Sequence, residues 1–209
     1  MSPENFGSAI RFERRRQIGR KPGGYANTYY VRSEDGTLAL RAHTMNAGTG
    51  GDTIFVDAQS GVPQFAVHPK RKVLNLKYDV LDTTGSVIGR LKQHMGGGRS
   101  FWSILDGNGE ERATIVAPDT ILQQFLMQTL NSAREAYTFV MGEAAFATLT
   151  QEQRPRQYMR GIKKFMYGLF APRDWVLRME PDNVAGLDPR VLIAGALMMQ
   201  ELTVTGIDD

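Results

Sequence analysis

The sequence predicts a mainly β fold, an antiparallel closed β-barrel of about twelve strands around a buried hydrophobic C-terminal helix, with one additional amphipathic helix. Three observations support it. Short β-prone runs bounded by turn residues fill residues 25–116, an amphipathic helical period occupies residues 119–136, and residues 191–199 are uninterruptedly apolar. Strands at such short spacing are typical of barrels and sandwiches built from hairpins. The apolar run at residues 191–199 favours a barrel, because a barrel can enclose a helix.

The strands are expected where runs rich in β-branched and aromatic residues lie between Gly, Asn, Asp or Pro. The polar, proline-interrupted residues 151–157 are expected to form a loop. The predicted strands cover residues 28–32, 38–44, 53–57, 64–68, 73–81, 87–92, 100–105, 112–116, 137–141, 145–150, 161–167 and 175–180.

A weak repeat joins several of these strands. An aliphatic residue is followed by Asp, a short spacer and Gly, and the pairs are Asp57 with Gly61, Asp82 with Gly85, and Asp106 with Gly109. An Asp side chain can cap a turn, and Gly supplies a positive φ. The repeat therefore predicts tight hairpins and no chemistry.

The C-terminal helix is predicted over residues 188–202. Asp188 is a suitable N-cap and Pro189 a suitable first helical residue, and residues 191–199 are apolar on every face. At ~1.5 Å per residue such a helix reaches only ~21 Å, short of a ~30 Å hydrocarbon core. We therefore expect it inside the barrel, where small residues let the wall approach closely: Ala194, Gly195 and Ala196.

The charge distribution predicts two regions. Residues 1–24 form a basic, flexible N-terminal arm, and residues 25–209 form the barrel domain. The arm carries most of the excess positive charge, from Arg11, Arg14, Arg15, Arg16, Arg20 and Lys21 against Glu4 and Glu13. The helix at residues 119–136 is either an insertion or a helix that caps the barrel.

Composition favours an intracellular protein. The chain has no cysteine, which excludes disulfides, thiolate nucleophiles and zinc fingers and fits a reducing compartment. The N-terminus shows no signal-peptide pattern, so the mature chain is expected to start near Met1. No apolar run is long enough for a transmembrane helix. We therefore expect a cytoplasmic protein that can bind peripherally at a membrane surface.

Three stretches resemble the tubby C-terminal-like superfamily, which contains the tubby proteins, the phospholipid scramblases and the LURP-one-related proteins. They are the hairpin series at 54–57 and 78–89, the segment 163–177, and the helix at 187–197. The resemblance implies a barrel around its C-terminal helix and, for some members, binding of phosphoinositides or other membrane lipids. The chain lacks the cysteine-rich segment and proline-rich N-terminus of animal scramblases, which argues against calcium-activated scrambling.

The sequence offers few candidate catalytic or metal-binding residues. His43, His68 and His94 lie in or beside different predicted strands and form no metal motif. The turn at Asp106 departs from an EF-hand, and the glycine-rich residues 96–98 lack the lysine of a P-loop. We expect no enzyme activity, no cofactor and no metal site.

Basic clusters are the remaining candidates for a site. Charge-assisted hydrogen bonds from them could hold inositol phosphates or anionic headgroups. The alternatives are a solvated turn, a lysine-protected edge strand and a disordered tail. The candidates are Lys70, Arg71 and Lys72 at a predicted hairpin tip, Lys163 and Lys164 beside aromatic residues, and Arg14, Arg15 and Arg16 in the arm.

The sequence thus predicts a non-enzymatic phospholipid- or phosphoinositide-binding adaptor at a membrane surface. A protein–protein interaction or assembly subunit is the first alternative, with residues 119–136 and the arm as its interface. Nucleic-acid binding through the basic arm is the second, although no strand interleaves aromatic residues with Arg or Lys.

Overall fold

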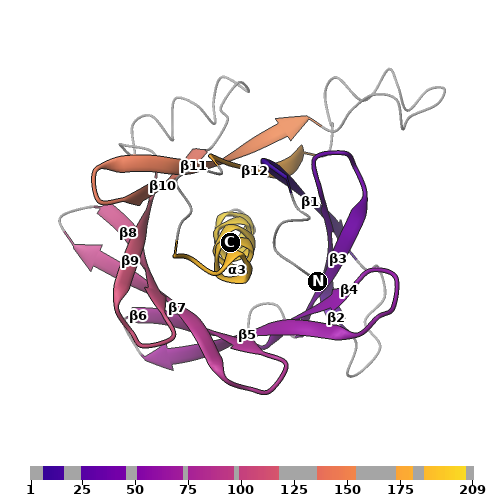
Figure 1. Ribbon diagram of the computed structural model, residues 1–209, viewed down its shortest axis with the longest axis horizontal. Coiled ribbons are helices and arrows are strands. Elements are labelled where there is room, and N and C mark those ends of the chain that lie inside the picture. Colours follow the sequence, from indigo (N-terminus) through magenta and orange to yellow (C-terminus); the bar gives the residue numbers. More distant parts are fainter. Residues whose placement is uncertain are drawn as a thin grey trace.

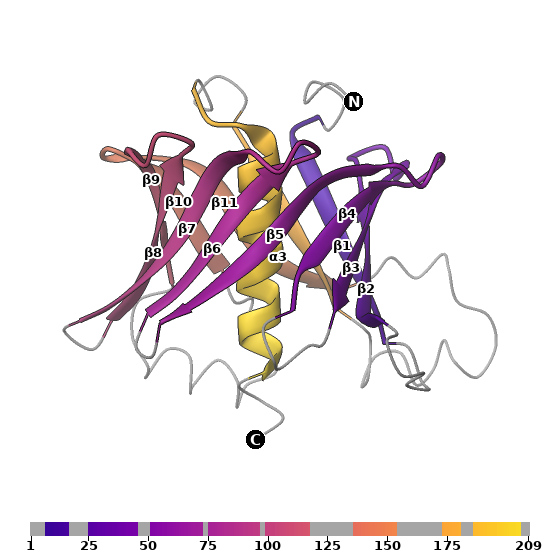
Figure 2. The same ribbon diagram turned by 90° about the horizontal axis from the view of Figure 1, so that it is seen from below.

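The described residues of the computed structural model form a closed antiparallel barrel around one helix (Figure 1). They are residues 7–16, 25–45, 51–72, 75–96, 99–117, 136–153, 173–180 and 186–205. The helix α3 (Pro189–Thr205) lies along the barrel axis in both views (Figures 1 and 2). The strands are β1 (Ala9–Arg16), β2 (Tyr25–Arg32), β3 (Leu38–Met45), β4 (Thr53–Asp57), β5 (Pro63–Lys72), β6 (Asn75–Asp82), β7 (Val87–Gly96), β8 (Arg99–Asp106), β9 (Glu111–Val116), β10 (Ala136–Met141), β11 (Ala144–Gln153) and β12 (Arg173–Met179). The predicted closed barrel with a central C-terminal helix is confirmed.

Each strand pairs with its neighbours in the chain, and β1 closes the barrel by pairing with β12. In this pair Ile10 lies opposite Leu177 and Phe12 opposite Trp175. Ile10 and Phe12 are fully buried. Residues 9–16 are therefore a barrel strand and not part of a flexible arm. Their apolar positions alternate with Arg11 and Glu13, a period of two that marks a strand even among many arginines.

The helix begins as its capping residues predict. The backbone N–H of Arg190 donates to Asp188 Oδ1 at 2.9 Å, and that of Val191 donates to the Asp188 carbonyl at 2.9 Å. The side chains expected in the core are all fully buried: Leu192, Ile193, Ala196 and Leu197. In the described part of the chain, no helix combines the length and apolarity needed to cross a membrane.

The three predicted Asp–Gly hairpins are confirmed. Gly61, Gly85 and Gly109 have φ of 71°, 83° and 91°. In each turn the aspartate side chain accepts backbone N–H groups, as Asp82 does from Thr84 and Ser86 at 2.8 and 2.9 Å. Hydrogen bonds from its own turn lower the pKa of Asp82, although burial acts against them. Figure 2 shows these hairpins at the end of the barrel where α3 begins.

The structure differs from the sequence prediction at several strand ends, among them the starts or ends of β2, β5, β7 and β11. The predicted loop over residues 151–157 is wrong at its start, because β11 continues to Gln153 and Glu152 pairs with Asp174 of β12. Strand β5 likewise continues through Pro69 to Lys72. The β4 ladder ends where Thr53 meets Val67, so Pro69 lies beyond it and breaks no hydrogen bond on that side.

Two predicted elements lie outside the described residues. They are the amphipathic helix at residues 119–136, apart from Ala136, which begins β10, and the strand at residues 161–167. Both stay predictions.

Small residues allow the wall to touch the helix. A Cβ at Gly89 of β7 would lie 2.5 Å from Val191 Cγ2, and a Cβ at Gly195 of α3 would lie 3.3 Å from Ile115 Cδ1. A contact of 2.5 Å requires the neighbouring atoms to move. Gly89 therefore marks a close approach between wall and helix, and Gly195 fulfils the role expected of it.

We predict that Leu197→Ala lowers the free energy of unfolding by about 2–5 kcal/mol, because it leaves a cavity between helix and wall. Val62→Ala, at a side chain that is 54% exposed, is the matched control and should have little effect. Chemical denaturation measures both. Deleting residues 188–209 should give insoluble protein, and a soluble truncation that unfolds cooperatively would contradict a core that depends on the helix.

We also predict that Gly89→Ala destabilises the barrel by about 1–3 kcal/mol through overpacking against Val191. Adding Val191→Ala removes the clashing methyl groups, so the double variant should be less destabilised than the two single variants together. Additive effects in this cycle would show that Gly89 is not tightly packed against the helix.

Candidate anion-binding surface

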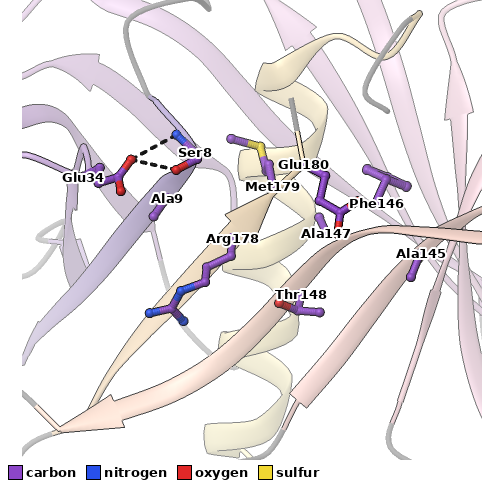
Figure 3. A pocket seen from close by; sticks show the side chains of 10 residues that line it. All are labelled: Ser8, Ala9, Glu34, Ala145, Phe146, Ala147, Thr148, Arg178, Met179 and Glu180. Atoms are coloured by element: carbon purple, nitrogen blue, oxygen red, sulfur yellow. Dashed lines mark hydrogen bonds between the residues drawn. The ribbon is translucent and has the colours of Figure 1, made fainter. Parts of the chain in front are cut away.

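Among the described residues, apolar side chains of wall and helix pack together inside the barrel. The core joins buried side chains from β1 to β12 with the apolar residues of α3. One pocket of about 360 Å³ lies at the end of the wall where β12 finishes. Figure 3 shows the side chains that line it. Its charged groups are already engaged, because Glu34 accepts from the Ser8 hydroxyl at 2.7 Å and Arg178 pairs with Glu152. We assign this pocket no ligand.

Three lysines lie side by side on the outer wall. Lys70 of β5 is directly opposite Lys77 of β6, and Lys77 is directly opposite Lys92 of β7. We call these three residues the lysine row. They face outward because the alternate residues on the same strands, Val67, Val80 and Leu91, are buried inside the barrel. Figure 2 shows the three strands adjacent on one side of the barrel.

The lysine row concentrates like charges. Directly opposite residues in an antiparallel pair have Cβ atoms ~4.5–5.5 Å apart, and like charges there are destabilising. Within the described part of the chain, no carboxylate forms an ion pair with Lys77 or Lys92. The wall therefore presents two cationic side chains that no described acid neutralises.

One carboxylate lies beside the row. Asp79 of β6 is only 1% exposed and pairs with Lys70 and, at 3.5 Å, with Arg90 Nε of β7. Asp79 Oδ1 is buried and has no hydrogen-bond partner. His68, opposite Asp79 on β5, contacts Asp52 at 2.6 Å. Asp79 thus pairs with two cations, Lys70 and Arg90, and leaves Lys77 and Lys92 without an ion pair among the described residues.

The predicted site at residues 70–72 is only partly as expected. Lys70 lies on the outer face within β5, because the strand ends at Lys72 and the β5–β6 hairpin turns further along the chain than predicted. Arg71 and Lys72 are the last two residues of β5, opposite Leu76 and Asn75. Lys163 and Lys164 lie outside the described residues.

The arginines expected in the arm belong to the wall. Arg14 follows Ile10 and Phe12 on the inward side of β1, is half-buried, and donates from Nη2 to Asn27 Oδ1 at 3.3 Å. Asn27 in turn donates to Glu201 of α3 at 3.4 Å. Arg14 therefore faces the end of the helix. Arg15 and Arg16 lie opposite Thr28 and Asn27 in the ladder with β2.

Sequence reasoning missed Lys77, Lys92 and Arg90. The usable signal is the turn between β6 and β7, because Asp82 and Gly85 close a hairpin whose register places Lys77 opposite Lys92. Alternation along each strand then places both lysines on the face opposite Val80 and Leu91.

Other charged groups on the wall stabilise it. Glu152 of β11 pairs with Arg11 of β1 at 3.3 Å and with Arg178 of β12, and Arg11 also lies 3.5 Å from the buried Asp174. Burial acts to raise the pKa of Glu152, but Arg178 and Arg11 outweigh it, so that pKa lies below its ordinary value of 4.5. This network joins the strands at the closure of the barrel.

The pair formed by His94 and Ser103 is closed to a substrate. His94 Nε2 lies 2.9 Å from Ser103 Oγ, but Ser103 is only 1% exposed, so a substrate cannot reach the hydroxyl. Burial, together with the positive charge of Arg41, lowers the pKa of His43. Within the described ranges, no group of three or more His, Asp or Glu side chains is placed to hold a metal ion.

No family model, curated protein or solved structure matches this chain. The resemblance to the tubby-like barrels therefore stays a prediction.

We predict that Glu152→Gln removes part of the acid sensitivity of folding. Because the pKa of Glu152 is lower in the folded state, its ion pairs stabilise the protein above pH 4.5, and this contribution disappears as pH falls through the folded value. Unfolding free energies compared from neutral to acidic pH should differ between variant and parent mainly above pH 4.5. Glu143→Gln, in the exposed β10–β11 turn, is the control and should follow the parent at every pH. A Glu152→Gln protein with the parent's pH profile would contradict the role of these pairs.

Proposed function

We propose that the protein is a non-enzymatic adaptor that binds anionic membrane lipids peripherally through the lysine row. The observation that carries the proposal is the register of β5, β6 and β7, which sets three lysines directly opposite one another. An arrangement that destabilises the folded wall is explained if a partner with several negative charges occupies it.

The dimensions of the row fit a surface of phosphate groups. Neighbouring strands are ~4.8 Å apart, so three strands place the lysine backbones across roughly 10 Å. Each basic residue near an anionic membrane contributes about 1 kcal/mol. Lys72 lies two residues after Lys70 on β5 and stays a proposed contributor, whereas Arg71 occupies the alternate position, in phase with the buried Val67. Lys163 and Lys164 remain proposed contributors on the sequence alone.

The resemblance to tubby-like barrels supports the same proposal, because some of those proteins bind phosphoinositides. The cytoplasm is the location we propose, since that is where a peripheral protein without cysteines meets anionic lipids. A partner-binding function would instead use residues 119–136, and nothing in the described residues favours it.

We predict that the protein sediments with vesicles of phosphatidylserine or phosphoinositide in phosphatidylcholine at low salt and is released as salt rises. Lys92→Gln should weaken this binding about fivefold, the loss that corresponds to about 1 kcal/mol. Lys77→Gln should act similarly, since Lys77 has no described ion pair to lose.

Arg41→Gln is the matched control, because Arg41 is an exposed cation on β3, away from the row. It removes the same charge and should weaken binding much less. Equal losses of binding for Lys92→Gln and Arg41→Gln would show that only the net charge of the protein matters. A parent protein that does not bind anionic vesicles at low salt would refute the proposal. Deleting residues 1–22 is unsuitable as a test because it removes β1 and opens the barrel.

A further inference from the structure

We infer that the lipid-binding wall also carries an apolar wedge, Phe101 and Val116, that enters the bilayer interface beside the lysine row. This inference rests on the proposed function and specifies the partner as a bilayer rather than a soluble phosphate. Phe101 of β8 is directly opposite Val116 of β9, and each is 37% exposed. Among the described large hydrophobic residues, the only other exposed one is Val62.

The wedge and the lysine row share one face. Trp102 and Ile115 are buried inside the barrel, so their neighbours Phe101 and Val116 point outward. His94 of β7 is opposite Phe101, and their rings stack with centroids 4.7 Å apart. Lys92 is two residues before His94 on the same side of β7, so Phe101 is its diagonal neighbour on β8, roughly 7–8 Å away, and Val116 lies one strand further.

The combination of groups matches the interface of a bilayer. Cations contact lipid phosphates, and an adjacent aromatic ring and aliphatic side chain gain by leaving water for the boundary between headgroups and acyl chains. A soluble polyphosphate satisfies the lysines but offers the apolar pair nothing. The ring of His94 supports Phe101 from one side, so Phe101 is held outward without the need for a flexible loop.

The charges around the wedge are consistent with a wedge that faces an anionic bilayer. Lys92 and the half-buried Lys77 lie on the side toward the middle of the wall, and the hydroxyl of Ser103, next to Phe101, is already bonded to His94. The residues paired across this ladder step are His94, Phe101, Val116 and Thr138, and none of them is acidic. An anionic surface can therefore approach the wedge without meeting a carboxylate in that step.

The test separates the apolar contribution from the electrostatic one. Phe101→Ala should lower binding to phosphatidylserine vesicles about three- to tenfold, the range expected for removing a partly buried apolar side chain from the interface. The relative loss should grow at high salt, where the lysines are screened. Binding of soluble inositol hexakisphosphate should be unchanged. Val62→Ala, an exposed apolar residue in the β4–β5 turn, is the matched control and should bind vesicles like the parent.

A second variant reports insertion directly. Phe101→Trp keeps an aromatic ring at the wedge, and the two native tryptophans, Trp102 and Trp175, are buried in the barrel core. The added emission should shift to shorter wavelength on vesicles and be quenched by lipids brominated near the headgroup.

The outcomes distinguish the two proposals. If Lys92→Gln weakens vesicle binding but Phe101→Ala does not, or if the Phe101→Trp emission is not quenched on bound vesicles, the wedge is refuted while lipid binding stands. If the parent binds inositol hexakisphosphate but no vesicle, the partner is a soluble anion and the wedge is refuted. If the parent binds neither, the proposed function fails and the wedge with it.

Discussion

The structure depends on filling the lumen of the barrel with α3. Side chains alone fill a barrel of about eight strands, whereas the wall here has twelve, so its inner face needs further apolar material. A helix that is apolar on every face must be surrounded by apolar surface, because exposing any of its faces to water is unfavourable. Gly89 and Gly195 let the two surfaces meet without a gap. The helix buries the apolar inner face of the wall, and the wall buries the apolar surface of the helix. We therefore expect the two to fold together.

This solution leaves the outer wall as a surface available for binding among the described residues. At the end where α3 begins, acidic residues such as Asp57, Asp82 and Asp106 are engaged in their own turns. At the barrel closure, Arg11 and Arg178 are neutralised by Glu152 and Asp174. The lysine row on β5, β6 and β7 differs from both, because its positive charges exceed the acid beside them. The Asp–Gly turns set the register of the hairpins, and that register brings the three lysines of the row side by side.

The sequence was most informative where the signal is local. The Asp–Gly turns, most strand positions and the helix with its Asp188 cap follow from residues within a few positions of one another. Strand β1 was missed because its arginines obscured a short alternation, and its partner β12 lies at the other end of the chain. The lysine row was missed because Lys70, Lys77 and Lys92 form no cluster in the sequence. They meet only through ladder register, which a search for consecutive basic residues overlooks.

Asp79 shows how the wall tolerates this row. Its carboxylate is almost fully buried, yet one oxygen has no hydrogen-bond partner, an unfavourable state for an ionised group unless cations compensate it. Lys70 and Arg90 do so from the strands on either side. A second acid beside Lys77 or Lys92 would relieve the remaining repulsion and add stability. It would also cancel the positive surface, so the incomplete neutralisation by Asp79 is the compromise expected if the wall binds anions as we propose.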